Sequence, residues 1–135
     1  MAQWIDSTTI VTSLQQERVL SRLNGSVRVE AFEAAKEIWK DPDLSLERPL
    51  LQTLRCGARP FNRMAAAHAM QVLSTQRTIR ALERAVGDGT ENPGVRGEAA
   101  EALAHSHRQE SHLVLLKALL DPSREVRFWC AFALG

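Results

Sequence analysis

Histidines and carboxylates are the residues of this sequence whose types could support metal binding or acid–base chemistry. Three of the four histidines, His105, His107 and His112, fall in the segment HSHRQESH. A metal site needs ligand atoms that converge at about 2 Å from one ion. Because these three straddle an expected loop and helix start, we expect solvated side chains there. Glu98 and Glu101 lie one helical turn apart, but no pattern around them predicts a pocket that would raise either pKa.

Other chemical signatures are missing from the sequence. It has no glycine-rich phosphate loop, no nucleophile elbow and no pairing of cysteine with histidine. The two cysteines, Cys56 and Cys130, are far apart and read as reduced thiols. We therefore predict that the chain is not an enzyme and uses neither a cofactor nor a metal.

Arginines recur along the chain at separations of 35, 33 and 31 residues, at Arg28, Arg63, Arg96 and Arg127. Such a row could bind phosphates, or each arginine could bond an acid or carbonyl group of a neighbouring repeat. The formal net charge is +1, which provides no basic field for nucleic acid or a membrane surface. We therefore favour the structural role for this row.

A smaller arginine group lies in the segment QRTIRALER, where Arg77, Arg80 and Arg84 share one helix face. This group could bind an anion or nucleic acid. We favour a solvated outer face, because the rest of the sequence shows no basic groove.

Helices that repeat with the arginine row must position all of these residues. Four segments align on the arginines: VRVEAFEAAKEIW, NRMAAAHAMQVL, VRGEAAEALAHS and VRFWCAFALG. Six residues after each arginine stands an alanine, at Ala34, Ala69, Ala102 and Ala133. The small apolar positions follow a helical period, so each segment predicts a closely packed second helix with this alanine buried.

A first helix precedes each of these segments. Leucine-rich runs occur in ERPLLQTL, RTIRALERAV and SHLVLLKALL, and an earlier helix is expected over residues 7–23. Glycine, proline and aspartate punctuate the chain between the helices. No segment has a sustained period of two, so we predict an all-α fold, an α-solenoid of about four helix pairs over residues 1–135.

The leucine run followed by DPSREVRFWCAFALG resembles HEAT-like (armadillo-type) repeats, and is closest to the short bacterial repeats named after phycobilin lyases. The resemblance covers nearly the whole chain. It implies a cytoplasmic protein-binding scaffold in which the second helices line a concave face. The alternatives that it implies are a tetrapyrrole-binding enzyme or accessory of the phycobilin-lyase type and, with less support, a nucleic-acid-binding protein.

The exposed positions of the second helices are our candidate partner-binding residues. Acidic and aromatic side chains there would suit a helix or peptide of another protein with basic flanks. His68 is expected to be an ordinary surface residue of this face. The full set is Val29, Glu30, Glu33, Met64, His68, Glu98, Glu101, Phe128, Trp129 and Phe132.

The last expected helix carries apolar side chains on both faces. Counted from the repeated arginine, Phe128, Trp129 and Phe132 occupy positions at which the other three segments have mostly polar or small residues. Solenoids usually end in a repeat with a polar outer surface. We therefore expect a second copy of the chain or further repeats of a longer array to cover this end. The start MAQWIDSTT has no basic or long apolar region, so we expect no signal peptide. No apolar run approaches about 18 residues, so we expect no segment that spans a membrane.

Overall fold

The computed structural model describes residues 7–106 and 109–135, and within these ranges it contains helices and no strand. The α-helices are α1 (Ser7–Leu23), α2 (Arg28–Lys40), α3 (Glu47–Cys56), α4 (Pro60–Ala69), α5 (Gln76–Gly87), α6 (Pro93–Ser106), α7 (His112–Ala118) and α8 (Arg124–Leu134). Short 3-10 helices cover Leu44–Leu46, Met70–Val72 and Gln109–Ser111. The predicted all-α solenoid is confirmed for the described ranges.

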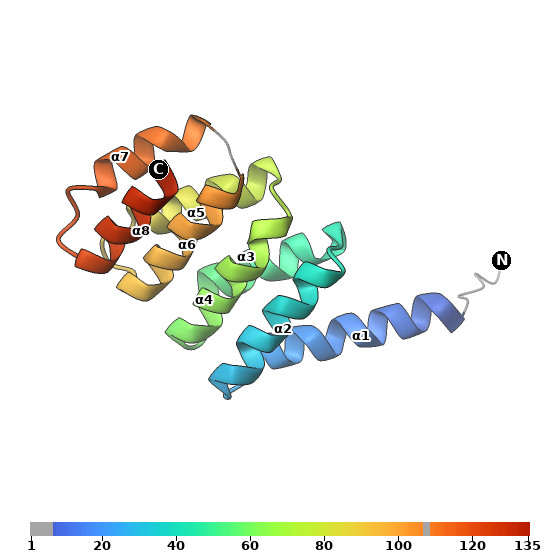
Figure 1. The fold of residues 1–135 in the computed structure, drawn as a ribbon. Helices are drawn as coiled ribbons and strands as arrows, with labels where there is room; N and C mark the ends of the chain where they lie inside the picture. Colours follow the sequence, from blue (N-terminus) through green and yellow to red (C-terminus); the bar gives the residue numbers. More distant parts are fainter. Residues whose placement is uncertain (1–6, 107–108) are drawn as a thin grey trace.

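The helices form two layers. Each odd-numbered helix packs on the even-numbered helix that follows it, and α2, α4, α6 and α8 pack side by side in sequence order. The odd-numbered helices contact one another much less. The N-terminal half of α1 extends away from the other helices (Figure 1). The even-numbered layer is therefore the continuous part of the structure, and it carries the aligned segments of the sequence.

Alanines allow the even-numbered helices to approach closely. Ala34 and Ala69 have no exposed surface and Ala102 is 1% exposed, as the repeat alignment predicts. Ala133 is only partly buried, so the prediction is wrong for the fourth copy. The reason is that α8 has α6 as its lateral neighbour on one side and no described helix on the other.

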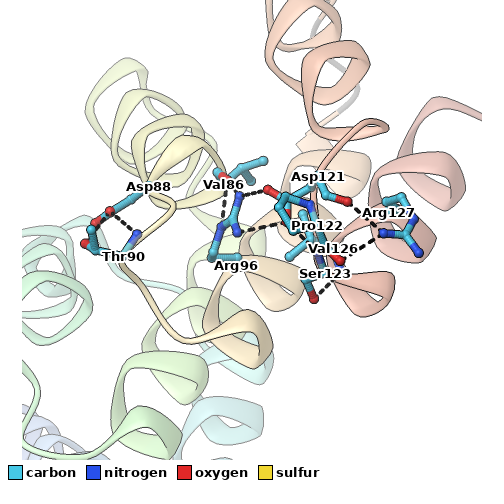
Figure 2. A network of polar contacts seen from close by, with 9 residues as sticks. All are labelled: Val86, Asp88, Thr90, Arg96, Asp121, Pro122, Ser123, Val126 and Arg127. Atoms are coloured by element: carbon cyan, nitrogen blue, oxygen red, sulfur yellow. Dashed lines mark hydrogen bonds and ion pairs between the residues drawn. The ribbon is translucent and has the colours of Figure 1, made fainter.

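Two arginines of the repeated row tie consecutive helix pairs together. Arg63 donates from Nε and Nη2 to the two carboxylate oxygens of Glu91, at 2.9 Å each. Arg96 forms the equivalent ion pair with Asp121, and its Nε and Nη2 also donate to the carbonyl oxygen of Val86 (Figure 2). Each arginine therefore bonds an acid in the loop before the next even-numbered helix.

The ends of the row differ. Arg127 donates to the carbonyl oxygens of Asp121 and Pro122 in its own loop (Figure 2). Arg28 is exposed and lies over the ring of Phe32, 5.9 Å from its centroid. The segment CGARP, which precedes α4, contains no acid for Arg28 to bond. The expected bond to a neighbouring repeat is thus confirmed for Arg63 and Arg96. It is wrong for Arg127, which bonds carbonyls of its own loop, and for Arg28, which makes a weaker contact within its own helix.

Asn62 replaces the valine that precedes the arginine in the other three copies. Its side chain is fully buried, and Nδ2 donates to the carbonyl oxygens of Leu23 and Gly25, at 2.7 and 2.9 Å. These carbonyls belong to the last residue of α1 and to the loop just after it, where helical partners are lacking. Asn62 therefore joins α4 to the end of α1 through polar bonds at a position where the other copies use apolar packing.

In the part of the chain that the structure describes, no helix combines the length and the apolar character needed to cross a bilayer.

Candidate functional site

Side chains of α2, α4, α6 and α8 meet on one face of the even-numbered layer, which we call the second-helix face. The ring of Trp39 on α2 contacts that of His68 on α4, and His68 contacts Glu98 on α6. On the next step, Trp129 of α8 lies against Gly97 of α6. These contacts link the four helices in a row and bring His68, Glu98 and Trp129 of the predicted set onto it. That the other predicted residues share this face stays a prediction.

His68 is held firmly at the centre of the row. Its ring centroid is 4.2 Å from that of Trp39 and 5.7 Å from that of Phe32, and its side chain is 15% exposed. The indole Nε1 of Trp39 donates to the carbonyl oxygen of His68 at 2.7 Å. The expectation of an ordinary surface histidine is therefore wrong, because two aromatic side chains from α2 enclose the imidazole.

The imidazole faces a pair of glutamates on α6. Nδ1 of His68 lies 3.2 Å from Oε2 of Glu98, and Gln71 Nε2 lies 3.4 Å from the same nitrogen. Glu98 and Glu101 occupy neighbouring turns of one helix face. Burial raises the pKa of the Glu101 carboxyl, and the charge of Glu98 raises it further, while His68 and His105 lower it. The expectation that nothing there would raise a carboxyl pKa is wrong.

These three side chains have the composition of a metal site. One nitrogen of His68 and one carboxylate oxygen each from Glu98 and Glu101 all lie within 4.8 Å of one another. All three residues are partly buried. Among the described residues, no other group of three histidine, cysteine, aspartate or glutamate side chains lies close enough together to hold an ion.

Aromatic side chains of α8 form what we call the aromatic ledge, consisting of Phe128, Trp129 and Phe132. Trp129 is partly buried, and both phenylalanines meet its ring edge-on, at centroid distances of 5.2 and 5.5 Å. Phe128 is 60% exposed and Phe132 is 54% exposed. The ledge therefore presents a large apolar surface next to α6.

The α2 end of the face carries the remaining acids. Val29 is 64% exposed, and Glu30 and Glu33 are exposed. Arg22 of α1 pairs with Glu33 at 3.7 Å and with Glu37 at 2.6 Å. The negative charge expected here is consequently reduced by a cation that belongs to the same helix pair.

Met64 is the last member of the predicted set. It is partly buried against the core, and a Cβ atom built on Gly94 would lie 3.1 Å from its sulfur. Met64 therefore fills space between α4 and the start of α6. It exposes less surface to a partner than we expected from its predicted exposed position on the second helix.

Of the other predicted groups, the described histidines of the segment HSHRQESH do not converge, whereas three arginines line one groove. His105 and His112 are exposed on different helices, and His107 lies outside the described residues. Arg77, Arg80 and Arg84 are exposed on α5, where they line a groove of about 1300 Å³ together with residues of α3. The sequence expectation of a solvated outer helix face agrees with their exposure.

Sequence reasoning missed three residues that shape the site. Phe32 and Trp39 lie at positions that the alignment did not mark as exposed, yet they enclose His68. Gly97 is buried and gives the Trp129 indole room to lie on α6. A glycine one position from Glu98 was the available signal, since glycine inside a helix has a cost that a close approach can explain.

Comparison with known proteins gives one informative match. No family model matches the chain. Bovine deoxyhypusine hydroxylase is 35% identical to it over 85 residues, which are 63% of this chain and 28% of that enzyme. The chain thus spans between a quarter and a third of the length of this relative. Because that enzyme is a HEAT-repeat protein, the match supports a HEAT-like helical repeat organisation. The resemblance to bacterial phycobilin-lyase repeats stays a prediction.

The match also corrects the prediction that the chain is not an enzyme. The similar protein is an enzyme, and its similarity extends over more than half of this chain. The absence of a recognised catalytic motif was therefore a wrong basis for excluding activity. A site can form from residues of separate helices, and no local sequence motif records such a site.

Proposed function

We propose that the second-helix face binds a segment of another protein, with an apolar side of that segment seated on the aromatic ledge. The observation that carries this proposal is the exposure of Phe128 and Phe132, at 60% and 54%, on either side of the Trp129 ring. Burying one such aromatic side chain is worth about 1.5–3 kcal/mol relative to leaving it in water. Aromatic anchors of this kind are enriched in the centres of protein interfaces.

Charge contributes less to this interface than the sequence suggested. Glu33 and Glu37 are paired with Arg22, and Glu98 lies against His68. Glu30 and Glu101 have no ion pair among the described contacts, and they remain as negative positions beside the apolar surface. The segment that fits best is therefore mainly apolar, with basic residues at its flanks.

Fluorescence anisotropy with a defined peptide tests the proposal. The probe is a labelled amphipathic helix with a leucine face and lysine flanks, and a second probe replaces the lysines by glutamates. We expect saturable binding of the lysine probe, weaker binding of the glutamate probe, and loss of binding in the double variant F128E/F132E. Circular dichroism checks that the double variant stays folded.

Leu113→Glu on α7 is the matched control, because Leu113 is 63% exposed but lies on the other layer. It should bind the probe as the unchanged chain does. Equal loss in the control and the double variant, or no binding at all, contradicts the proposal. Sedimentation of the chain alone tests whether a second copy of the chain covers the aromatic ledge instead. Self-association that F128E/F132E abolishes would assign the ledge to that second copy.

The similarity to deoxyhypusine hydroxylase favours a second candidate, in which the chain is part of an enzyme and the bound segment is its substrate. Incubation with a peptide that contains deoxyhypusine, together with dioxygen and a reductant, tests this candidate. Mass spectrometry should show the gain of one oxygen atom in the peptide, with the second oxygen atom reduced to water. The tetrapyrrole-binding and nucleic-acid-binding alternatives stay predictions. Visible absorbance on mixing with a bilin and salt-dependent binding to duplex DNA are their respective tests.

A further inference from the structure

We propose that His68, Glu98 and Glu101 bind one divalent transition-metal ion of the zinc type at the centre of the second-helix face. The three ligand atoms lie within 4.8 Å of one another and come from two adjacent helices, α4 and α6. This site is independent of the aromatic ledge, since it uses no residue of α8.

The distance between the first two ligands already suits a shared ion. Nδ1 of His68 and Oε2 of Glu98 are 3.2 Å apart. Zinc lies about 2.0–2.2 Å from nitrogen and oxygen ligands, so two ligands of one zinc are about 3.0–3.5 Å apart at the usual angles. The third carboxylate needs only a change of its side-chain torsions, because Glu101 lies one turn from Glu98 on the same face of α6.

The imidazole is held in place before any ion arrives. Its ring lies against Trp39, and the Trp39 indole N–H is bonded to the His68 backbone carbonyl. Phe32 contacts the ring from a second side. A ligand that is fixed by its surroundings loses little freedom when it binds, which favours affinity.

The ligand types select the class of ion. One imidazole with two carboxylates suits zinc, manganese, cobalt or nickel, whereas calcium and magnesium prefer oxygen ligands alone. Two glutamates in partly buried positions also lose their mutual repulsion when a dication lies between them. Three protein ligands leave at least one position of the ion open to a water molecule or another ligand.

Titration of the untagged, chelator-treated chain with Zn²⁺ and Co²⁺ tests the proposal. Calorimetry should show one site for each ion, with no competition from equimolar Mg²⁺ or Ca²⁺. Bound Co²⁺ should quench tryptophan fluorescence, because the Trp39 ring contacts the ligand ring at 4.2 Å. In Trp39→Phe, quenching should fall sharply while calorimetric binding remains, which places the ion beside Trp39.

His68→Ala, Glu98→Gln and Glu101→Gln should each weaken Zn²⁺ affinity by about 10–100-fold or more, since even outer partners of metal ligands have effects of this size. His112→Ala on α7 and Glu33→Gln on α2 are the matched controls, and both should leave the affinity unchanged. If His68→Ala unfolds the chain, the two glutamine variants and the Co²⁺ quenching still show whether the ion binds at this site. Absence of binding, or binding lost in His112→Ala and retained in Glu101→Gln, overturns the proposal. Peptide binding by F128E/F132E and metal binding by Glu101→Gln are separate readouts, so this site and the proposed function can fail independently.

Discussion

The indole of Trp129 lies directly over Gly97 of the neighbouring helix: a Cβ atom at residue 97 would stand 2.8 Å from the indole Cδ1. That distance is shorter than a normal contact, so any side chain at residue 97 has to displace the ring. Gly97 therefore determines how deeply Trp129 sits between α6 and α8. It also determines how the two phenylalanines that meet the Trp129 ring are presented.

Gly97→Ala should consequently shift the Trp129 fluorescence spectrum and reduce binding of the peptide probe. Alanine in a helix interior is favoured over glycine by about 1 kcal/mol, which opposes the cost of displacing the ring. In a Trp129→Ala background only the favourable term remains, so Gly97→Ala should be stabilising there. Urea unfolding of the four proteins measures this coupling. Additive effects of the two changes would show that Gly97 and Trp129 do not depend on each other.

Arg96→Ala should be far more destabilising than Arg28→Ala, although both residues occupy the same offset of a second helix. The Arg96 side chain is 6% exposed and is paired with Asp121, which has a side chain only 10% exposed. Removing one partner of such a buried pair costs about 3–5 kcal/mol. Arg28 has only an exposed contact over Phe32, worth about 0.5–1 kcal/mol. Similar unfolding free energies for the two variants would contradict this ranking.

The same ion pair predicts a dependence of stability on pH. The hydrogen bonds from Arg96 hold the pKa of the Asp121 carboxyl below its ordinary value of 3.8, against the opposing effect of burial. Because the folded-state pKa is the lower one, the stabilisation is fully present above the ordinary value. It is lost as the pH falls from there through the folded-state pKa. As the pH is lowered below about 5, the unfolding free energy of the unchanged chain should therefore fall more steeply than that of Asp121→Asn. Parallel pH profiles would exclude this role for Asp121.

Asn62→Val should destabilise the fold, although valine stands at the matching position of the other three copies. The change leaves the carbonyl oxygen of Leu23 without its side-chain donor, and it leaves that of Gly25 with the longer bond from Arg59 Nη1, at 3.3 Å. A buried polar group that loses its partner costs about 1–3 kcal/mol. Thermal unfolding compared with that of Val95→Ala, a purely apolar change at the equivalent position, separates the polar effect from packing. A rise in melting temperature for Asn62→Val would mean that the repeat consensus outweighs these hydrogen bonds.

The sequence by itself determined the helices and their order. The apolar period of each segment and the alanines at Ala34, Ala69 and Ala102 identify buried helix faces, because a helix repeats its surface every three to four residues. The spacing of Arg63 and Arg96 likewise predicted structural bonds, since equivalent positions in stacked repeats meet equivalent loops. These features depend on neighbours along one helix or on a regular repeat, both of which a sequence records.

Only the tertiary structure decided which contacts are made by the side chains at the predicted exposed positions of the second helices. His68 is enclosed because Trp39 and Phe32 reach it from α2, and it meets Glu98 because α4 and α6 are close enough for their side chains to touch. These contacts join residues about 30 positions apart, and their distances depend on the angle and spacing of helices. A periodic pattern states which face a residue occupies, whereas the partner across the interface is set by how the helices pack.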